Sequence, residues 1–214
     1  MAGTAMKPYY EQDGITIYCG DCRDILPTLD AGSIDLVLTD PPYGVDFDVW
    51  DSEVPYQIVA QFPQSTVAWF GAASRLAKDV NLFPELPHRV GIWAPTFTLS
   101  RTRADGMAYR WHPIYLWRVP KKHEGPTWDL FTTPTECGNW WLHQCTKPLK
   151  LITTLAGLAP ANGTILDPFM GSGTTLRAAK DLGRKAIGIE IEERYCEIAV
   201  KRLQQAVLPM GEVA

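Results

Sequence analysis

Short apolar runs alternate with segments of helical spacing along most of the chain. Runs rich in β-branched, aromatic or leucine residues predict strands at 15–18, 33–39, 67–71, 89–94, 112–118, 164–166 and 185–189. Apolar residues at helical spacing predict helices at 22–29, 54–62, 74–81, 149–158, 174–182 and 192–205. The alternation predicts an α/β fold, a Rossmann-like and mostly parallel sheet with helices on both faces. The strands at 89–94 and 112–118 lack a full helix between them, which predicts one antiparallel pair.

The chain carries no internal repeat, low-complexity tract or linker, so residues 1–214 are interpreted as a single domain. A length of 214 residues is enough to bury a sizeable core. Residues 121–146 are the least regular stretch, with four aromatic residues among prolines, glycines and threonines. We interpret this stretch as a surface loop folded over its own aromatic side chains.

A glycine-rich turn lies between the predicted strand at 164–166 and the helix at 174–182. It reads Asp167-Pro168-Phe169-Met170-Gly171-Ser172-Gly173-Thr174-Thr175. Its two glycines allow a sharp turn and a close approach to a ligand, and open α/β sheets bind ligands at such strand ends. The pattern is not that of a phosphate loop, because no Lys follows the second glycine and residue 176 is Leu. An ordinary βα turn is the alternative interpretation.

A carboxylate ends the next predicted strand, at Glu190. A carboxylate in this position can accept hydrogen bonds from both hydroxyls of a ribose. A ligand with a ribose and no phosphate therefore fits the turn and Glu190 together, and S-adenosylmethionine is the obvious candidate.

The second motif, Asp40-Pro41-Pro42-Tyr43, also directly follows a predicted strand. The two prolines remove two backbone donors, so the motif offers carbonyls and the Asp40 carboxylate as acceptors. Such a site suits an exocyclic NH2 group, whose lone pair would then be free to attack a methyl sulfonium. Tyr43 offers a flat face on which a base could stack. The alternative is a proline turn that caps the strand, with a local bond from Asp40.

Charge and cysteine content narrow the class of protein. The net charge of −4 does not indicate nucleic-acid binding, but residues 101–122 hold six basic residues and one acidic residue. The basic residues are Arg101, Arg103, Arg110, Arg118, Lys121 and Lys122. The apolar stretches are too short to span a bilayer, and residues 1–10 do not resemble a signal peptide. These two features predict a cytoplasmic protein with no membrane partner. Five cysteines with one isolated C-x-x-C, at Cys19 and Cys22, predict neither disulfides nor a metal site.

Taken together, five motifs resemble those of the β-group DNA amino-methyltransferases, the N6-adenine and N4-cytosine family. Residues 40–43 resemble the catalytic tetrapeptide, and residues 167–175 resemble the cofactor loop. The strand end that binds the ribose in the family is matched by residues 188–190, and its adenine site is matched by residues 20–22. The family's His-Pro-Thr-Gln-Lys-Pro motif is matched by residues 143–148, where its middle is rearranged. The tetrapeptide precedes the cofactor loop, which is the circularly permuted order of the β group.

The resemblance implies roles for individual residues. Asp40, Pro41, Pro42 and Tyr43 would be catalytic. The residues implied in cofactor binding are Asp21, Cys22, Lys147, Asp167, Phe169, Gly171, Ser172, Gly173, Thr174 and Glu190. Asp21 would accept from the adenine amino group, Phe169 and Gly171 would pack on the cofactor, and Thr174 and Lys147 would lie near its methionine end. The base would flip out of double-stranded DNA, and no metal would be needed.

The resemblance also ranks the substrates. Asp at the first position of the tetrapeptide favours adenine N6, with cytosine N4 as the alternative. Enzymes that methylate glutamine in proteins usually have Asn at that position and the opposite order of motifs, so this alternative is disfavoured. A non-catalytic module that binds only nucleic acid or cofactor is also disfavoured, because it has no chemical reason to keep Asp40 and Asp167. C5-cytosine methylation requires a Pro-Cys nucleophile, which the sequence lacks.

The stretch between the tetrapeptide and residue 143 is short for the family. A target-recognition region would therefore be small, within about 94–141. Either the recognition sequence is short or relaxed, or a homodimer supplies further contacts.

Overall fold

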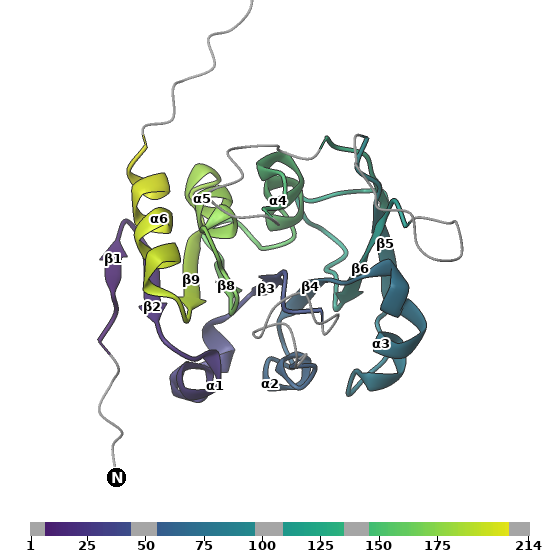
Figure 1. Cartoon of the computed structure of the whole chain (residues 1–214), viewed down its shortest axis with the longest axis horizontal. Helices are drawn as coiled ribbons and strands as arrows, with labels where there is room; N and C mark the ends of the chain where they lie inside the picture. Colours follow the sequence, from purple (N-terminus) through teal and green to yellow (C-terminus); the bar gives the residue numbers. More distant parts are fainter. Residues whose placement is uncertain (1–6, 44–54, 97–108, 135–145, 206–214) are drawn as a thin grey trace, which may run out of the picture.

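The computed structural model describes residues 7–43, 55–96, 109–134 and 146–205. These residues form one nine-stranded sheet in the order β1-β2-β9-β8-β3-β4-β6-β5-β7, covered by helices on both faces (Figure 1). None of the helices in this part of the chain has the length and apolar character that a bilayer crossing needs. The part of the chain that the structure describes does not include Arg101, Arg103, Cys137 or residues 143–145 of the motif at 143–148.

Five neighbouring strands are parallel and form the centre of the sheet. They are β2 (Ile15–Cys19), β9 (Lys185–Glu190), β8 (Thr164–Asp167), β3 (Leu36–Thr39) and β4 (Thr66–Phe70). Neighbouring strands are paired with little stagger. For example, Leu36 lies opposite Ile165, and Asp167 lies opposite Gly188. All five carboxyl ends therefore meet at one edge of the sheet.

The predicted antiparallel pair is β5 (Arg89–Trp93) with β6 (His112–Trp117). Two further antiparallel pairings were not predicted: β6 lies against β4, and the edge strand β1 (Tyr10–Gln12) lies against β2. Inside the stretch interpreted as a loop, β7 (Leu130–Phe131) pairs parallel with β5. A strand of two residues is too short to show a hydrophobic period, so β7 could not be predicted from its residues.

Within the described residues, helices cover both faces of the sheet (Figure 1). One face carries α4 (Leu149–Ala156), α5 (Thr174–Asp181) and α6 (Glu193–Gln204). The other carries α1 (Cys22–Ile25), α2 (Ile58–Gln61) and α3 (Leu76–Leu82). The second set is shorter than predicted. The helix expected at 22–29 tightens into a 3-10 turn at Leu26–Thr28, which contains Pro27, and α3 begins only after another 3-10 turn at Ala73–Arg75.

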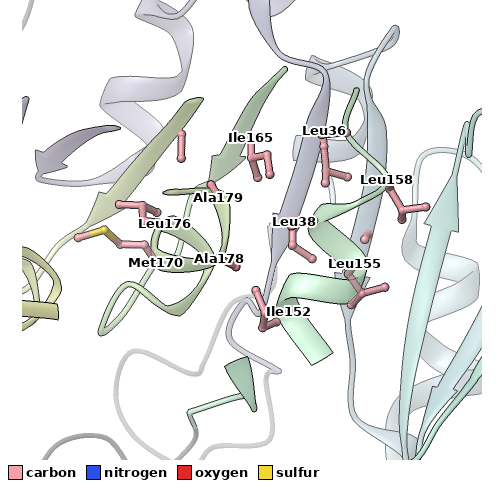
Figure 2. Packing of buried hydrophobic residues seen from close by; sticks show 14 of the residues in the cluster. Leu36, Leu38, Ile152, Leu155, Leu158, Ile165, Met170, Leu176, Ala178 and Ala179 are labelled. Atoms are coloured by element: carbon pink, nitrogen blue, oxygen red, sulfur yellow. The ribbon is translucent and has the colours of Figure 1, made fainter. Parts of the chain in front are cut away.

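Alternation along β3 divides the core in two. Leu36 and Leu38 belong to the cluster beneath α4 and α5, while Val37 points into the cluster on the opposite face. Figure 2 shows Leu38 near Ile152 and Leu155 of α4, and Leu36 further along β3, nearer Leu158. Because β3 is buried on both faces, the residue after it is held rigidly in place, and that residue is Asp40.

Candidate active site

The candidate site lies where the chain reverses direction across the sheet. From β8 the chain passes through α5 to β9 on one side, whereas from β3 it passes through α2 to β4 on the other. Ligands of open α/β sheets bind at such a switch point, outside the carboxyl ends of the strands. Neighbouring strands are roughly 4.8 Å apart, so the ends of β9 and β3 lie about 10 Å apart. That separation suits a nucleoside with an extended side chain.

A side-chain hydrogen bond joins the two sequence motifs. The hydroxyl of Thr39, the residue before Asp40, donates to Asp167 Oδ1 at 3.0 Å, and Phe169 N donates to the same oxygen at 3.2 Å. Burial raises the pKa of Asp167 to about 7, against hydrogen bonds that lower it and with a smaller raising contribution from the Asp40 charge. The tetrapeptide and the cofactor loop are therefore neighbours in space, as the methyltransferase hypothesis requires.

Backbone bonds hold the glycine-rich turn against β9. Met170 N donates to Ile189 O at 3.0 Å, and Gly173 N donates to Met170 O at 2.9 Å. Gly171 and Gly173 both have positive φ, at 50° and 79°. At Gly173 a Cβ atom would lie 2.7 Å from the Ala199 Cβ of α6, so this position combines a left-handed backbone with a close helix contact.

Glu190 is fixed in place by two main-chain donors. Gly171 N donates to its Oε2 at 3.0 Å and Glu192 N to its Oε1 at 2.9 Å. Burial raises the pKa of Glu190, and these hydrogen bonds oppose the increase. A carboxylate has about four acceptor positions, so each oxygen keeps capacity for one ribose hydroxyl.

Asp21 and Cys22 lie one strand further along the same edge. Gly20 N donates to Glu190 O at 2.9 Å, which places the end of β2 directly beside Glu190. The Asp21 side chain caps α1 by accepting from Arg23 N at 2.8 Å. Its hydrogen bonds with Arg23 lower the pKa of Asp21, so the acceptor stays ionised. Burial raises the pKa of the Cys22 thiol to about 11, which keeps it protonated and unreactive.

The remaining loop residues are packed into the fold. Ser172 and Thr174 are buried, and the Thr174 hydroxyl accepts from the Arg202 guanidinium of α6. Phe169 is half-buried and packs against the hydrophobic cluster on the α1 face. The loop is thus braced by both helices that follow it.

A compact group of side chains surrounds the tetrapeptide. We call it the Asp40 cluster; its members are Asp40, Tyr43, Phe70, Trp93 and Lys147. The Lys147 ammonium pairs with Asp40 Oδ2 and lies 2.9 Å from the Tyr43 hydroxyl, which donates to Asp40 Oδ1. Its Nζ is also 5.2, 5.4 and 5.9 Å from the ring centroids of Phe70, Tyr43 and Trp93. The Lys147 ammonium therefore lies at the catalytic tetrapeptide, and its place near the methionine end of the cofactor, which the resemblance implies, stays a prediction.

The prolines of the tetrapeptide follow β3 directly. Pro41 is buried and Pro42 is half-buried. Neither can donate a backbone hydrogen bond, and the side chains that donate to Asp40 are those of Tyr43, within the tetrapeptide, and of the distant Lys147. Because 107 residues separate Lys147 from Asp40, this arrangement depends on the tertiary fold.

His112 was missed by sequence reasoning. It begins β6, whose antiparallel direction brings its first residue to the same sheet edge, opposite Trp93. The two rings stack with centroids 5.0 Å apart and an interplanar angle of 27°. Burial, followed by the charge of Lys147, lowers the pKa of His112 to about 4, against a raising contribution from Asp40. The imidazole is therefore neutral at pH 7.

One of the basic residues expected at the DNA surface is used inside the fold. Arg118 Nε donates to Ser65 O at 2.7 Å, its NH1 pairs with Glu85, and its backbone N donates to His88 Nδ1 at 3.1 Å. The Arg118 guanidinium is therefore engaged by backbone carbonyls and a carboxylate at one end of the sheet. Arg110, Lys121 and Lys122 are exposed.

Comparison with known proteins gives consistent relatives. The type II methyltransferase M.HinfI of Haemophilus influenzae is 27% identical over 251 residues, covering 89% of this chain and 68% of that protein. M.ScaI of Streptomyces caespitosus is 25% identical over 266 residues, covering 92% of this chain and 84% of that protein.

Solved structures share the fold. A crystal structure of an M1.HpyAVI–SAM complex matches with a TM-score of 0.69 at 24% identity, covering 88% of this chain and 100% of that one. The PvuII DNA methyltransferase, described as cytosine-N4-specific, matches with a TM-score of 0.73 at 17% identity, covering 94% of this chain and 90% of that one.

The model of the N6/N4 DNA methylase family matches residues 92–201. The predicted fold class is confirmed by the solved structures, and the predictions of a DNA amino-methyltransferase and of S-adenosylmethionine as its cofactor are confirmed at the level of the family. The chain belongs to the N6/N4 family of DNA methylases.

Proposed function

We propose that this protein transfers a methyl group from S-adenosylmethionine to N6 of an adenine flipped out of double-stranded DNA. The observation that carries this proposal is the hydrogen bond from Thr39 to Asp167, which ties the tetrapeptide to the cofactor loop. In this proposal the cofactor loop holds the methyl donor, and the tetrapeptide accepts the hydrogens of the target amine. Both then lie at the same edge of the sheet.

The order of the strand ends supports a proposed position for each part of the cofactor. Asp21 after β2 receives the adenine amino group, and Glu190 at the end of β9 receives the ribose hydroxyls. Phe169 and the Gly171 backbone pack beside the nucleoside. Asp167 would lie beside the sulfonium and methionine portion, and Ser172, Gly173 and Thr174 would support the loop that holds it.

The chemistry at Asp40 is a direct displacement. The target amino group donates its hydrogens to the Asp40 carboxylate and to a tetrapeptide carbonyl, which localises the nitrogen lone pair. That lone pair attacks the methyl carbon, the N–C bond forms as the S–C bond breaks, and the sulfonium becomes a neutral thioether. The amine then loses one proton, for which Asp40 is the nearest base.

Lys147 acts on this step through Asp40. Its ammonium is buried against the carboxylate and is held there by three aromatic faces and the Tyr43 hydroxyl. It fixes the carboxylate orientation before the base arrives, so we assign Lys147 a positioning role. Tyr43 provides the face on which the base stacks.

Recognition of DNA falls to the remainder of the single domain. Residues from about 94–141 supply the sequence-reading contacts in this proposal, with Arg110, Lys121 and Lys122 on phosphates. A second copy of the chain would extend this small surface. Size-exclusion chromatography with and without DNA measures whether the active species is a dimer.

A single labelling experiment tests the proposed reaction. Purified protein is incubated with methyl-labelled S-adenosylmethionine and unmethylated double-stranded DNA, and the product is digested to nucleosides. We expect the label in N6-methyl-2′-deoxyadenosine. Label in N4-methyl-2′-deoxycytidine would retain the mechanism and change the base, since both bases present an exocyclic amine to the same acceptors. Absence of label from DNA would contradict the proposal.

A further inference from the structure

The two strands that carry the motifs lose their backbone pairing as they approach the site. The pairing ends at Val37 of β3 and Leu166 of β8, and within the described residues it reaches no further toward the carboxyl ends. If the same register continued, Thr39 would lie opposite Pro168, which has no N–H to donate to a ladder. Backbone pairing therefore does not fix the end of β3 against the end of β8.

On their other sides both strand ends remain paired. Thr39 lies opposite Trp69 of β4, and Asp167 lies opposite Gly188 of β9. The half of the site that receives the base is thus fixed to β4, and the cofactor half is fixed to β9. Open α/β sheets bind ligands at such a switch point, so the separation of these two strand ends decides how closely the halves of the site approach each other.

A side-chain hydrogen bond joins β3 to β8 where the ladder has ended. Thr39 is buried, and its hydroxyl donates to Asp167 Oδ1 at 3.0 Å. The same oxygen accepts from Phe169 N of the cofactor loop at 3.2 Å. The Thr175 hydroxyl, in the first turn of α5, is a further donor to this carboxylate. Asp167 thus connects the end of β3 to the cofactor loop and to the helix that follows it.

Methyl transfer is sensitive to the separation that this bond holds. A displacement needs nitrogen, methyl carbon and sulfur in line and in close contact, and a misplacement of about 1 Å can cost on the order of 10²-fold in rate. In the proposed function Asp40 holds the nitrogen and the cofactor loop holds the sulfonium. Because Thr39 immediately precedes Asp40, a shift of β3 relative to Asp167 moves the nitrogen relative to the methyl group.

We propose that Thr39 is a positioning residue for methyl transfer, whose hydroxyl holds the tetrapeptide at reacting distance from the cofactor loop through Asp167. This inference rests on the proposed function and adds to it a residue outside the sequence motifs. Only 1% of Thr39 is exposed, so it acts through Asp167 and Asp40 and not by contact with a ligand. Its contribution should therefore appear in the rate of the chemical step and not in the affinity for cofactor or DNA.

Thr39→Val tests the bond with little change in shape, because it replaces the hydroxyl by a methyl group. We expect the single-turnover rate of methyl transfer, measured with labelled S-adenosylmethionine and saturating duplex DNA, to fall by about tenfold. The Kd for S-adenosylmethionine, measured by calorimetry, and KM for DNA should each stay within about twofold of the wild-type values. Thr39→Ser keeps the donor and should restore most of the rate.

Thr66 provides a matched control on the neighbouring strand. Its side chain is also buried, and its hydroxyl donates to Arg118 O at 2.9 Å. This bond lies at the start of β4, at the sheet edge opposite the site. Thr66→Val therefore removes a comparable buried hydrogen bond away from the reacting groups. Urea unfolding should show a similar loss of stability in both valine variants, whereas only Thr39→Val should slow methyl transfer.

Four results would refute the positioning role while leaving the proposed function in place. Thr39→Val protein that is less stable but transfers methyl at the wild-type rate would make Thr39 purely structural. A loss confined to cofactor affinity would show that the bond supports the cofactor loop alone. Equal slowing in Thr66→Val would assign the effect to general destabilisation, and Thr39→Ser as slow as Thr39→Val would exclude the hydroxyl. Wild-type protein that labels no DNA, in contrast, would remove the proposed function and this inference with it.

Discussion

The two halves of the site are built in different ways. The cofactor half comes from one continuous stretch, β8-α5-β9, and its key contacts run through backbone atoms, such as Gly171 N to Glu190 and Met170 N to Ile189 O. The half that receives the base is assembled from side chains on β3, β4, β5 and β6 and on the segment before α4. Its central contact, between Lys147 and Asp40, joins residues 107 positions apart. The first half depends on backbone geometry together with the Glu190 carboxylate, whereas the second half is made of side chains brought together from distant segments.

The largest expected effect is at Asp40. Asp40→Ala removes the acceptor for the amine and should lower kcat by on the order of 10³-fold, because both lone-pair localisation and proton removal are lost. Cofactor affinity should stay within about twofold by calorimetry, since the cofactor half is intact. Asp24→Ala, an exposed carboxylate on α1, serves as control. Equal loss of cofactor binding and catalysis in Asp40→Ala would mean that the two halves are not separable.

Asp167 links the halves through a pH-dependent contribution to stability. Its folded pKa, about 7, lies above the ordinary value of 3.8, so the folded state binds more protons than the unfolded state between these values. Its contribution is full below about pH 4 and is lost as pH rises toward 7. We expect the difference in unfolding free energy between wild type and Asp167→Asn to fall by a few kcal/mol across this range. Urea unfolding at pH 4.5, 6 and 7.5 measures it, and a pH-independent difference would refute the assignment.

Glu190 should affect binding without affecting the chemical step. Glu190→Ala removes two acceptors for the ribose and should weaken S-adenosylmethionine binding by about 10²-fold, as expected for hydrogen bonds to a charged group. At saturating cofactor kcat should change little. Titration calorimetry and steady-state kinetics separate the two quantities. A fall in kcat with unchanged affinity would assign Glu190 to the other half of the site.

Gly173 tests the backbone construction of the cofactor half. Gly173→Ala must accommodate a φ of 79° and a Cβ 2.7 Å from Ala199, so we expect a loss of about 2 kcal/mol in stability. Gly183 has a similar φ of 65° with open space around it, so Gly183→Ala isolates the backbone strain and should be milder. Thermal unfolding measures both variants. Equal losses would show that the contact with α6 contributes nothing.

The smallest effect is expected at Lys147, which acts only through Asp40. Lys147→Met keeps most of the apolar contacts with the aromatic rings and should lower kcat by about tenfold, with cofactor affinity unchanged. Lys147→Arg should recover part of the loss by restoring the ion pair. The resemblance alone placed Lys147 near the methionine end of the cofactor. A selective loss of cofactor affinity in Lys147→Met would support that position and contradict the positioning role.

The sequence determined the elements whose signal is local. Buried strands such as β3 and β8 are short continuous apolar runs, and the cofactor loop identifies itself because glycine is needed at Gly171 and Gly173 for reasons of backbone geometry within a few residues. The alternation of strands and helices likewise predicted the mostly parallel sheet. Both motifs directly follow predicted strands, and the carboxyl ends of parallel strands lie at one edge of the sheet. The sequence therefore predicted that the two loops would meet.

Only the tertiary structure decided which side chains from distant segments come together. Strand β7, the additional antiparallel pairings, the inward use of Arg118 and the placement of Lys147 at the tetrapeptide all depend on contacts between residues far apart in the chain. His112 had no motif to mark it and lies at the edge that carries the site because β6 runs antiparallel beside β5. Backbone conformation is set by neighbouring residues, whereas a cluster of side chains is set by the packing of the whole sheet.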